Sequence, residues 1–140
     1  MEEGHIFNRS DCGGCGICTE VCVFGALEMV GREVSVREIL NELLPEGIFY
    51  EQSGGGVTVS GGEPLMQPEF TKALLKACKE EGLHTCMETC GFGAKDVISD
   101  LQKYTDLFLF DYKLTDDRKH KEYTGVGNEK ILDNFEILKK

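Results

Sequence analysis

The sequence predicts an α/β fold with a parallel β-sheet, preceded by a cysteine-rich segment. Short apolar or β-branched runs alternate with segments whose apolar residues recur at helical spacing, an order typical of parallel βα units with right-handed crossovers. Four of the seven cysteines fall between positions 12 and 22. We therefore predict two parts, a cysteine-rich segment of residues 1–30 and an α/β part of residues 31–140.

The α/β part is predicted to begin with a helix after Ser35. Ser35 and Glu38 form a capping-box pattern, apolar residues follow at helical spacing, and the next proline ends the helix. Residues 57–60 are a β-branched run beside glycines, which predicts the first strand. Pro68 then opens a second helix, which is expected to stop near Gly82.

The later elements continue this alternation. Residues 84–88 predict a second strand, and residues 94–103 a helix with apolar side chains on one face. Residues 107–112 form a nearly continuous apolar run, which predicts a strand buried on both faces. Apolar residues at helical spacing mark a last helix near the end of the sequence. Because three strands cannot close a barrel, we expect a fragment of a larger parallel sheet.

The charge balance limits the possible partners. The chain has 25 acidic and 15 basic residues and a formal net charge of -10, which argues against nucleic acid or an anionic membrane surface as the main partner. It has no apolar run long enough to span a membrane, and its start lacks the pattern of a secretory signal. The predicted location is cytoplasmic, where clustered cysteines indicate metal ligation or reactive thiols before disulfides.

The clustered cysteines predict an iron-sulfur site. Their spacing is C-x2-C-x2-C-x3-C, by which bacterial ferredoxin segments hold 4Fe-4S clusters, and the intervening glycines let the backbone approach the sulfides. Structural zinc usually uses two cysteine pairs separated by a longer loop. The predicted metal ligands are Cys12, Cys15, Cys18 and Cys22.

The number of clusters stays open at this point. In a two-cluster ferredoxin the fourth cysteine of such a run serves the other cluster. Either all four cysteines hold one cluster, or the missing ligands lie upstream of Met1. Cys78 and Cys86 are predicted to be buried hydrophobic residues, and the role of Cys90, just past a strand end, stays open.

A glycine pair and a carboxylate follow the first predicted strand directly, in the run VSGGEP. This strand end is where ligands bind in parallel α/β sheets. Gly61 and Gly62 would let the polar end of a ligand reach the backbone, and Glu63 would be free to accept from an ammonium group. The run has the spacing of neither common nucleotide-phosphate loop, and an ordinary tight turn remains the alternative.

Four stretches together resemble the activating enzymes of glycyl radical enzymes, within the radical S-adenosylmethionine superfamily. They are SGGGVTVSGGEPLMQPEF, GLHTCMETCGF, DLFLFDYKLTDD and HKEYTGVGNEKILDN, and the resemblance runs from Cys12 to the C-terminus. It implies that residues 31–140 are part of a (βα) barrel. It also implies that residues 1–30 are half of a ferredoxin-like 4Fe-4S insertion.

The same resemblance implies a cofactor site. The GGEP motif would bind the amino group of S-adenosylmethionine, and Lys113 would contact its carboxylate. Asp111, with Glu88 and Thr89, would line a site for a monovalent cation beside it. Without the resemblance these charged residues would be interpreted as surface or capping residues. The implied cofactor-binding residues are Gly61, Gly62, Glu63, Pro64, Glu88, Thr89, Asp111 and Lys113.

The implied reaction is reductive cleavage of S-adenosylmethionine to methionine and a 5'-deoxyadenosyl radical. The radical takes a hydrogen from a glycine of the partner, a glycyl radical enzyme, and a flavodoxin or ferredoxin would donate the electron. The superfamily's C-x3-C-x2-C motif is absent, because no three cysteines have this spacing. We therefore expect a fragment that begins inside the insertion, stops before the later barrel strands, and is itself inactive.

Two other interpretations stay open. A ferredoxin-type electron carrier would explain the cysteines but has no need of the GGEP motif. A zinc-stabilised interaction module would also use cysteine ligands. His84, Tyr112, His120 and Asn128 also fall in the resembling stretches, but the sequence assigns no chemistry to them.

Overall fold

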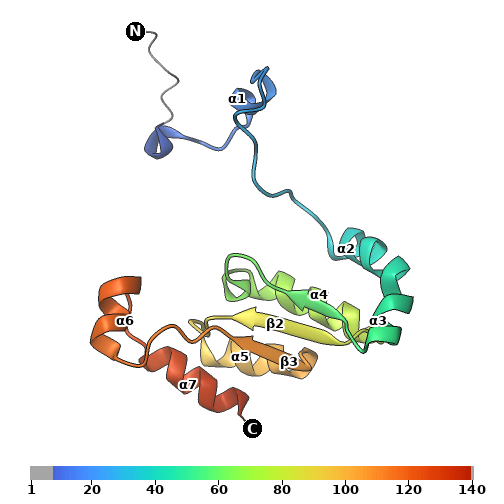
Figure 1. Cartoon of the computed structure of the whole chain (residues 1–140), viewed down its shortest axis with the longest axis vertical. Coiled ribbons are helices and arrows are strands. Elements are labelled where there is room, and N and C mark those ends of the chain that lie inside the picture. The colour runs from blue at the N-terminus through green and yellow to red at the C-terminus, as the bar shows by residue number, and fades with distance from the viewer. Residues whose placement is uncertain (1–7, 140) are drawn as a thin grey trace. The chain divides into compact units, whose positions relative to one another are not determined.

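The computed structural model describes residues 8–139. The chain divides into two compact units, Met1–Val34 and Ser35–Lys140, and each is described here by itself (Figure 1). The first seven residues of the predicted cysteine-rich segment lie outside the described residues, as does Lys140.

The first unit has little regular structure. It contains the 3-10 helix η1 (Arg9–Asp11) and the single-turn helix α1 (Ile17–Glu20). None of its described residues is buried, and side chains as large as Val23 and Phe24 are 93% and 95% exposed. The described part of this unit therefore lacks a hydrophobic core.

The second unit opens with two short helices. In α2 (Val36–Leu43) the predicted capping box is present, because Ser35 Oγ accepts from Glu38 N at 3.2 Å and Glu38 Oε2 accepts from Ser35 N at 2.7 Å. A 3-10 turn, η2 (Leu44–Glu46), leads into α3 (Gly47–Ser53). The sequence did not predict α3, because its glycine and aromatic residues favour helix only weakly.

Three parallel strands form the sheet, in the order β1-β2-β3 (Figure 1). Val57 pairs with Thr85, and Cys86 with Leu107. Two βα crossovers connect the strands, which confirms the predicted parallel α/β fold. The elements are β1 (Val57–Val59), η3 (Pro64–Met66), α4 (Pro68–Glu80), β2 (Thr85–Thr89), α5 (Lys95–Leu101), η4 (Gln102–Tyr104) and β3 (Leu107–Phe110).

Two helices follow β3. The second, α7 (Glu129–Leu138), matches the predicted last helix. The first, α6 (Asp117–Thr124), was not predicted, because its residues are polar on every face and carry no apolar periodicity. It begins at Asp116, whose side chain accepts from Lys119 N.

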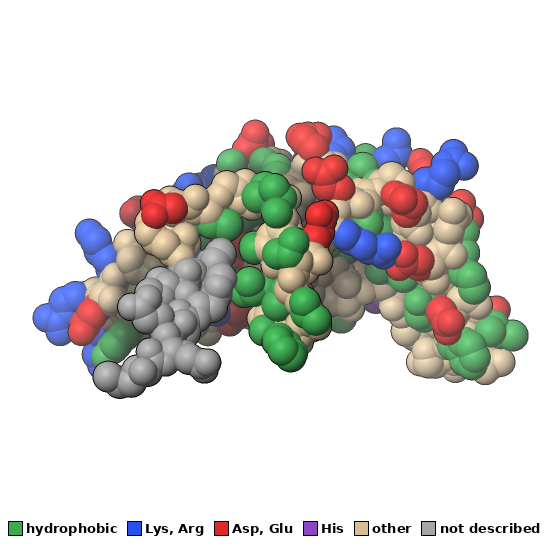
Figure 2. Space-filling view, turned by 90° about the horizontal axis from the view of Figure 1, so that it is seen from above, with side chains coloured by type: hydrophobic (Ala, Val, Ile, Leu, Met, Phe, Trp, Pro, Cys, Tyr) green, Lys and Arg blue, Asp and Glu red, His purple; other side chains and the backbone are tan. Residues whose placement is uncertain are grey.

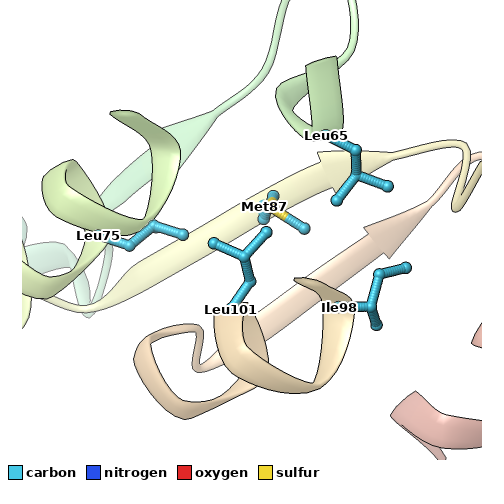
Figure 3. Close-up of a cluster of buried hydrophobic side chains, with 5 residues drawn as sticks. All are labelled: Leu65, Leu75, Met87, Ile98 and Leu101. Carbon is cyan, nitrogen blue, oxygen red and sulfur yellow. The ribbon is translucent and has the colours of Figure 1, made fainter. Parts of the chain in front are cut away.

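The core lies between the sheet and helices α4 and α5. Figure 3 shows its centre, where Met87 of β2 points toward Leu75 of α4 and Leu101 of α5. A second cluster includes Val57, Leu74 and Cys78 and is packed against α2. Cys78 and Cys86 are buried, as predicted.

The prediction that β3 is buried on both faces is wrong. Leu107 and Leu109 are 49% and 46% exposed, whereas Phe108, which points to the other face, packs against the core. Alternate residues of a strand point to opposite faces. Within residues 8–139, helices cover only the face that carries Met87 and Phe108, so the face that carries Leu107 and Leu109 is open.

Among the residues that the structure describes, no helix has both the length and the apolar character needed to cross a bilayer.

Replacing Leu75 tests the core. Leu75 is completely buried, so Leu75→Ala should lower the free energy of unfolding by about 2–5 kcal/mol in urea denaturation followed by circular dichroism. The matched control is Leu107→Ala on the open face, for which we expect a loss below about 1 kcal/mol. Equal losses for the two variants would contradict this assignment of the covered face.

Candidate functional site

A cavity of about 270 Å³ lies at the carboxyl ends of the three strands. Every predicted cofactor-binding residue except Pro64 lines it, and two further residues, Ser60 and Cys90, join them. Because the carboxyl ends of parallel strands meet at one edge of a sheet, three segments distant in the sequence form one site. The lining residues are Ser60, Gly61, Gly62, Glu63, Glu88, Thr89, Cys90, Asp111 and Lys113.

The turn after β1 depends on two glycines. Gly61 and Gly62 have φ angles of 79° and 54°, in the left-handed region that side chains disfavour, although a Cβ at either would meet no atom within 4 Å. Backbone conformation rather than space therefore requires glycine here. Pro64 is buried behind the turn, and its carbonyl accepts from Thr71 Oγ1 of α4 at 2.9 Å. Pro64 thus anchors the turn instead of lining the cavity.

The Glu63 carboxylate joins the ends of β1 and β2. Its Oε1 accepts from Leu65 N at 3.1 Å and from Thr89 Oγ1 at 2.6 Å. Its Oε2 accepts from Cys90 N at 2.9 Å. We call this arrangement of Glu63, Leu65, Thr89 and Cys90 the Glu63 clasp. The sequence analysis expected Glu63 to be free for an ammonium group, but this carboxylate is already engaged by neighbours in the chain.

The clasp keeps Glu63 ionised. Burial raises the pKa of Glu63, but hydrogen bonds from the Cys90 and Thr89 side chains and from the backbone N-H groups of Cys90 and Leu65 together lower it below its ordinary value. Burial, and then the hydrogen bond to Glu63, raise the pKa of Cys90, so its thiol keeps the proton that it donates. The sequence analysis left the role of Cys90 open, and the structure places its backbone N-H and its thiol against the Glu63 carboxylate.

Glu88 presents a second carboxylate to the cavity. It is exposed, and its Oε2 accepts from Ser60 Oγ at 2.6 Å. Ser60 was not among the predicted site residues. The strand register would have identified Ser60 as a site residue. Val59 pairs with Met87, and the next residues along the two strands are Ser60 and Glu88.

The end of β3 carries an ion pair. Lys113 Nζ and Asp111 Oδ2 are in direct contact, and the two side chains are 50% and 47% exposed. The hydrogen bond to Asp111 raises the pKa of Lys113, so the ammonium stays charged. Asp111 N donates to Thr89 O at 2.9 Å, which fixes this segment to the end of β2.

The cavity therefore offers both charge types that a free amino-acid group requires. Glu88 and Asp111 supply carboxylates, and Lys113 supplies an ammonium group within the same cavity. A zwitterion with its own ammonium and carboxylate groups would form charge-assisted hydrogen bonds with such a set. This chemistry matches the amino-acid end of S-adenosylmethionine.

The four predicted metal ligands are not gathered in the structure. Cys12, Cys15 and Cys18 are exposed, Cys22 is partly exposed, and all are free thiols. Across residues 8–139 no three His, Cys, Asp or Glu side chains come together as a metal site. The structure therefore leaves open which of these cysteines share a metal group.

The pKa of the Cys22 thiol is lowered by the backbone around it. Backbone N-H groups donate to its sulfur, first that of Leu27 and then those of Ala26, Phe24 and Gly25, and they lower its pKa despite an opposing effect of burial. A lowered thiol pKa favours the thiolate, which is the form that binds metal. Hydrogen bonds from the backbone to sulfur are also a usual second layer around iron-sulfur groups.

The fold and the cavity together define an α/β protein whose strand ends form a cavity lined by both acidic and basic side chains. The model of the family described as the radical SAM superfamily matches residues 11–140. The chain belongs to the radical SAM superfamily.

The similar proteins are activating enzymes. The chain is 48% identical to the choline trimethylamine-lyase activating enzyme of Oleidesulfovibrio alaskensis over 81% of its length and 36% of that protein. It is 42% identical to the trans-4-hydroxy-L-proline dehydratase activating enzyme of Clostridioides difficile, over 95% of its length and 54% of that protein. The chain thus spans between about a third and about half of these relatives. The resemblance to glycyl radical enzyme activating enzymes is confirmed.

A solved structure supports the fold assignment. It is a domain of a pyruvate-formate lyase-activating enzyme from Bacteroides vulgatus, with a TM-score of 0.53 and 38% identity. The match covers 58% of this chain and 50% of that chain.

Removing one donor tests the Glu63 clasp. Thr89→Val keeps the side-chain shape and should lower the free energy of unfolding by about 1–2 kcal/mol at pH 7. Because the clasp depresses the folded-state pKa of Glu63, its contribution is present above the unfolded-state pKa of about 4.3 and is lost as the pH falls through the folded-state value. The difference between variant and parent should therefore shrink as the pH is lowered from 7.

Urea denaturation at a series of pH values measures this effect. The matched control is Thr58→Val on the open face of β1, for which we expect a change within about 0.5 kcal/mol at every pH. A loss for Thr89→Val that stays constant from pH 7 into the acid range would contradict the clasp.

Proposed function

We propose that this chain supplies the S-adenosylmethionine site of an activating enzyme that generates the glycyl radical on a partner enzyme. The observation that carries the proposal is the cavity at the strand ends, where carboxylates and an ammonium group lie beside a turn of two glycines. Membership of the radical SAM superfamily and similarity to activating enzymes support it.

Each end of the ligand's amino-acid group has a partner in this proposal. The turn at Gly61 and Gly62, with Glu88 beside it, receives the ammonium group. Lys113 receives the carboxylate, and Asp111, Glu88 and the end of β2 at Thr89 line a monovalent-cation site. Glu63 and Pro64 act by holding the turn, since the Glu63 carboxylate is engaged in the clasp and Pro64 is buried.

The cysteine-rich segment fits an iron-sulfur role by its donor set. In the proposal residues 1–30 are part of a ferredoxin-like 4Fe-4S segment, and residues 31–140 are part of a radical SAM (βα) barrel. Cys12, Cys15, Cys18 and Cys22 would hold cluster iron, and the backbone donors around Cys22 support this. The cluster that would supply the electron for reductive cleavage of S-adenosylmethionine is a different one, held by the C-x3-C-x2-C motif that this sequence lacks.

The protein's own contribution is positioning. Charge-assisted contacts at both ends of the amino-acid group would fix the ligand in one orientation at the sheet edge. An electron carrier alone would have no use for these contacts. The cavity thus favours an S-adenosylmethionine enzyme over the alternative of a ferredoxin-type carrier.

The proposed partners are a glycyl radical enzyme and an electron donor such as flavodoxin or ferredoxin, in the cytoplasm. The net charge of -10 disfavours nucleic acid and anionic membranes. Figure 2 shows both acidic and basic side chains on the face that it presents, with several basic side chains near its left edge.

Titration with S-adenosylmethionine tests the site. We expect weak binding, with a Kd of about 1 mM, and backbone chemical-shift changes in NMR spectra at the residues that line the cavity. Lys113→Ala should weaken binding about tenfold because the ligand carboxylate loses its ammonium partner. Lys121→Ala on α6, outside the cavity, is the matched control and should leave the affinity unchanged. Shift changes confined to other regions, or equal affinity for both variants, would show that the site is misassigned.

Turnover by the chain alone is the second test. We expect no 5'-deoxyadenosine from the 140-residue chain with reconstituted iron, dithionite and S-adenosylmethionine, because the sequence holds no C-x3-C-x2-C motif. Chromatography of the products measures this directly. Detection of stoichiometric 5'-deoxyadenosine would contradict the expectation that the chain is inactive by itself.

A further inference from the structure

We propose that helix α7 positions the two loops that line the cavity, through two buried asparagine side chains, Asn128 and Asn134. The importance of this positioning for S-adenosylmethionine binding rests on the proposed function. The contacts of the two asparagines do not depend on it. Asn128 is 3% exposed and Asn134 is fully buried, and neither touches the cavity. Both are therefore positioning residues.

Asn134 holds the loop after β2. Its Nδ2 donates to Gly91 O at 2.8 Å and to Gly93 O at 3.0 Å, across more than 40 positions of sequence. This loop begins directly after Thr89 and Cys90, which form the Glu63 clasp. Gly91 N in turn donates to Thr89 Oγ1 at 3.0 Å. One continuous set of hydrogen bonds thus runs from α7 to the Glu63 carboxylate.

The loop after β2 contains two glycines and therefore needs hydrogen bonds from outside the loop to keep one conformation. Gly91 has a φ angle of 74°, and a Cβ there would lie 2.3 Å from the Phe110 ring, while a Cβ at Gly93 would lie 2.8 Å from Leu65. Close packing therefore restricts both positions to glycine. Glycine carries the largest conformational freedom of any residue, so a glycine loop keeps one shape only if other groups fix it.

The orientation of the Asn134 amide is well determined by its neighbours. Reversing the amide would point Oδ1 at two carbonyl oxygens, so the nitrogen must face Gly91 and Gly93. As a result Oδ1 is buried without a hydrogen-bond partner in the part of the chain that the structure describes. An unsatisfied buried acceptor is unfavourable. The Asn134 side chain is held in this orientation because both of its amide hydrogens bond to the loop after β2.

Asn128 holds the loop after β3 in the same way. Its Nδ2 donates to Leu114 O at 3.1 Å and to Thr115 O at 2.9 Å, immediately after Lys113. Its backbone N donates to Asp117 Oδ1 at 2.8 Å. Asn128 is the residue before the first turn of α7, so this contact also fixes where the helix begins.

His120 supports the position of Asn128. It is 2% exposed, and its Nδ1 lies 2.7 Å from Val126 O, which requires the proton to be on Nδ1. Thr124 Oγ1 donates to His120 O at 2.7 Å. These contacts fix the turn between α6 and α7. His120, to which the sequence analysis assigned no chemistry, therefore fixes the turn that leads into Asn128.

The two asparagines make one rigid connection between the loops. They lie six positions apart at and within one helix, so a displacement of α7 would move the loop that carries Cys90 and the loop that carries Lys113 together. The ring of Phe135 in α7 packs at a tilt of 52° against the ring of Phe110 in β3, with 5.0 Å between ring centroids, and adds to the fixed placement of the helix.

Alkylation of Cys90 tests the proposal without any cofactor. The 140-residue chain is treated with iodoacetamide under reducing conditions, and peptide mass spectrometry gives a rate for each cysteine. The variant Asn134→Asp is isosteric and places a carboxylate against two carbonyls. We expect its Cys90 to react at least about fivefold faster than in the parent, because losing about 1 kcal/mol of loop stabilisation raises the population of the open loop about fivefold. Cys78, which is fully buried, should stay protected.

The matched control is Asp133→Asn, next to Asn134 on α7. Asp133 forms an exposed ion pair with Lys95 at 2.7 Å, and its loss should leave the Cys90 rate unchanged. An unchanged Cys90 rate in Asn134→Asp with Cys78 protected would overturn the proposal. So would an equal acceleration in both variants.

If Cys78 becomes reactive in Asn134→Asp, that variant has lost its fold. The rigidity of the two loops is then measured on the unmodified chain. Backbone order parameters from NMR relaxation should be about 0.85 at residues 91–93 and 114–115, as in β2. Values below about 0.6 in either loop would overturn the proposal. Neither experiment contains S-adenosylmethionine, so a failed titration with rigid loops would contradict the proposed function alone.

Discussion

The site depends on one carboxylate, that of Glu63. It lies in a partly buried position where an ion is stable only with several hydrogen-bond donors, and Leu65, Thr89 and Cys90 supply them. Because these donors come from two strand ends, the carboxylate fixes the turn of Gly61 and Gly62 against β2. A site that must recognise both ends of an amino-acid group needs such a fixed frame, since small displacements weaken charge-assisted contacts on both sides.

Further hydrogen bonds support the Glu63 clasp and the loops beside it. The clasp rests on the loop after β2, this loop rests on Asn134, and Asn128 fixes the loop after β3. Glu88, Asp111 and Lys113 line the cavity with exposed charged groups, whereas Asn128 and Asn134, which hold the loops, are buried. The superfamily model matches residues 11–140 and therefore includes both groups of residues.

The sequence predicted the parts of this structure that depend on neighbouring residues. The capping box at Ser35 and the helix after Pro68 depend on contacts within one or two turns, and both are present. Family motifs identified most of the residues that line the cavity, but missed Ser60 and Cys90. Several of the bonds that organise the lining residues join distant residues, such as Thr89 to Glu63, 26 positions apart, and Asn134 to Gly91, 43 positions apart, and no local pattern reveals these. The open face of β3 was missed for a related reason, because an apolar run does not say how many faces are covered.

The central claim is that the cavity recognises an amino-acid group through Lys113 and Glu88. The most direct test compares S-adenosylmethionine with its decarboxylated form in an NMR titration of the same chain. If Lys113 binds the carboxylate, the decarboxylated compound should bind about tenfold more weakly, and Lys113→Ala should remove that difference. Equal affinity of the unmodified chain for the two compounds would contradict the claim.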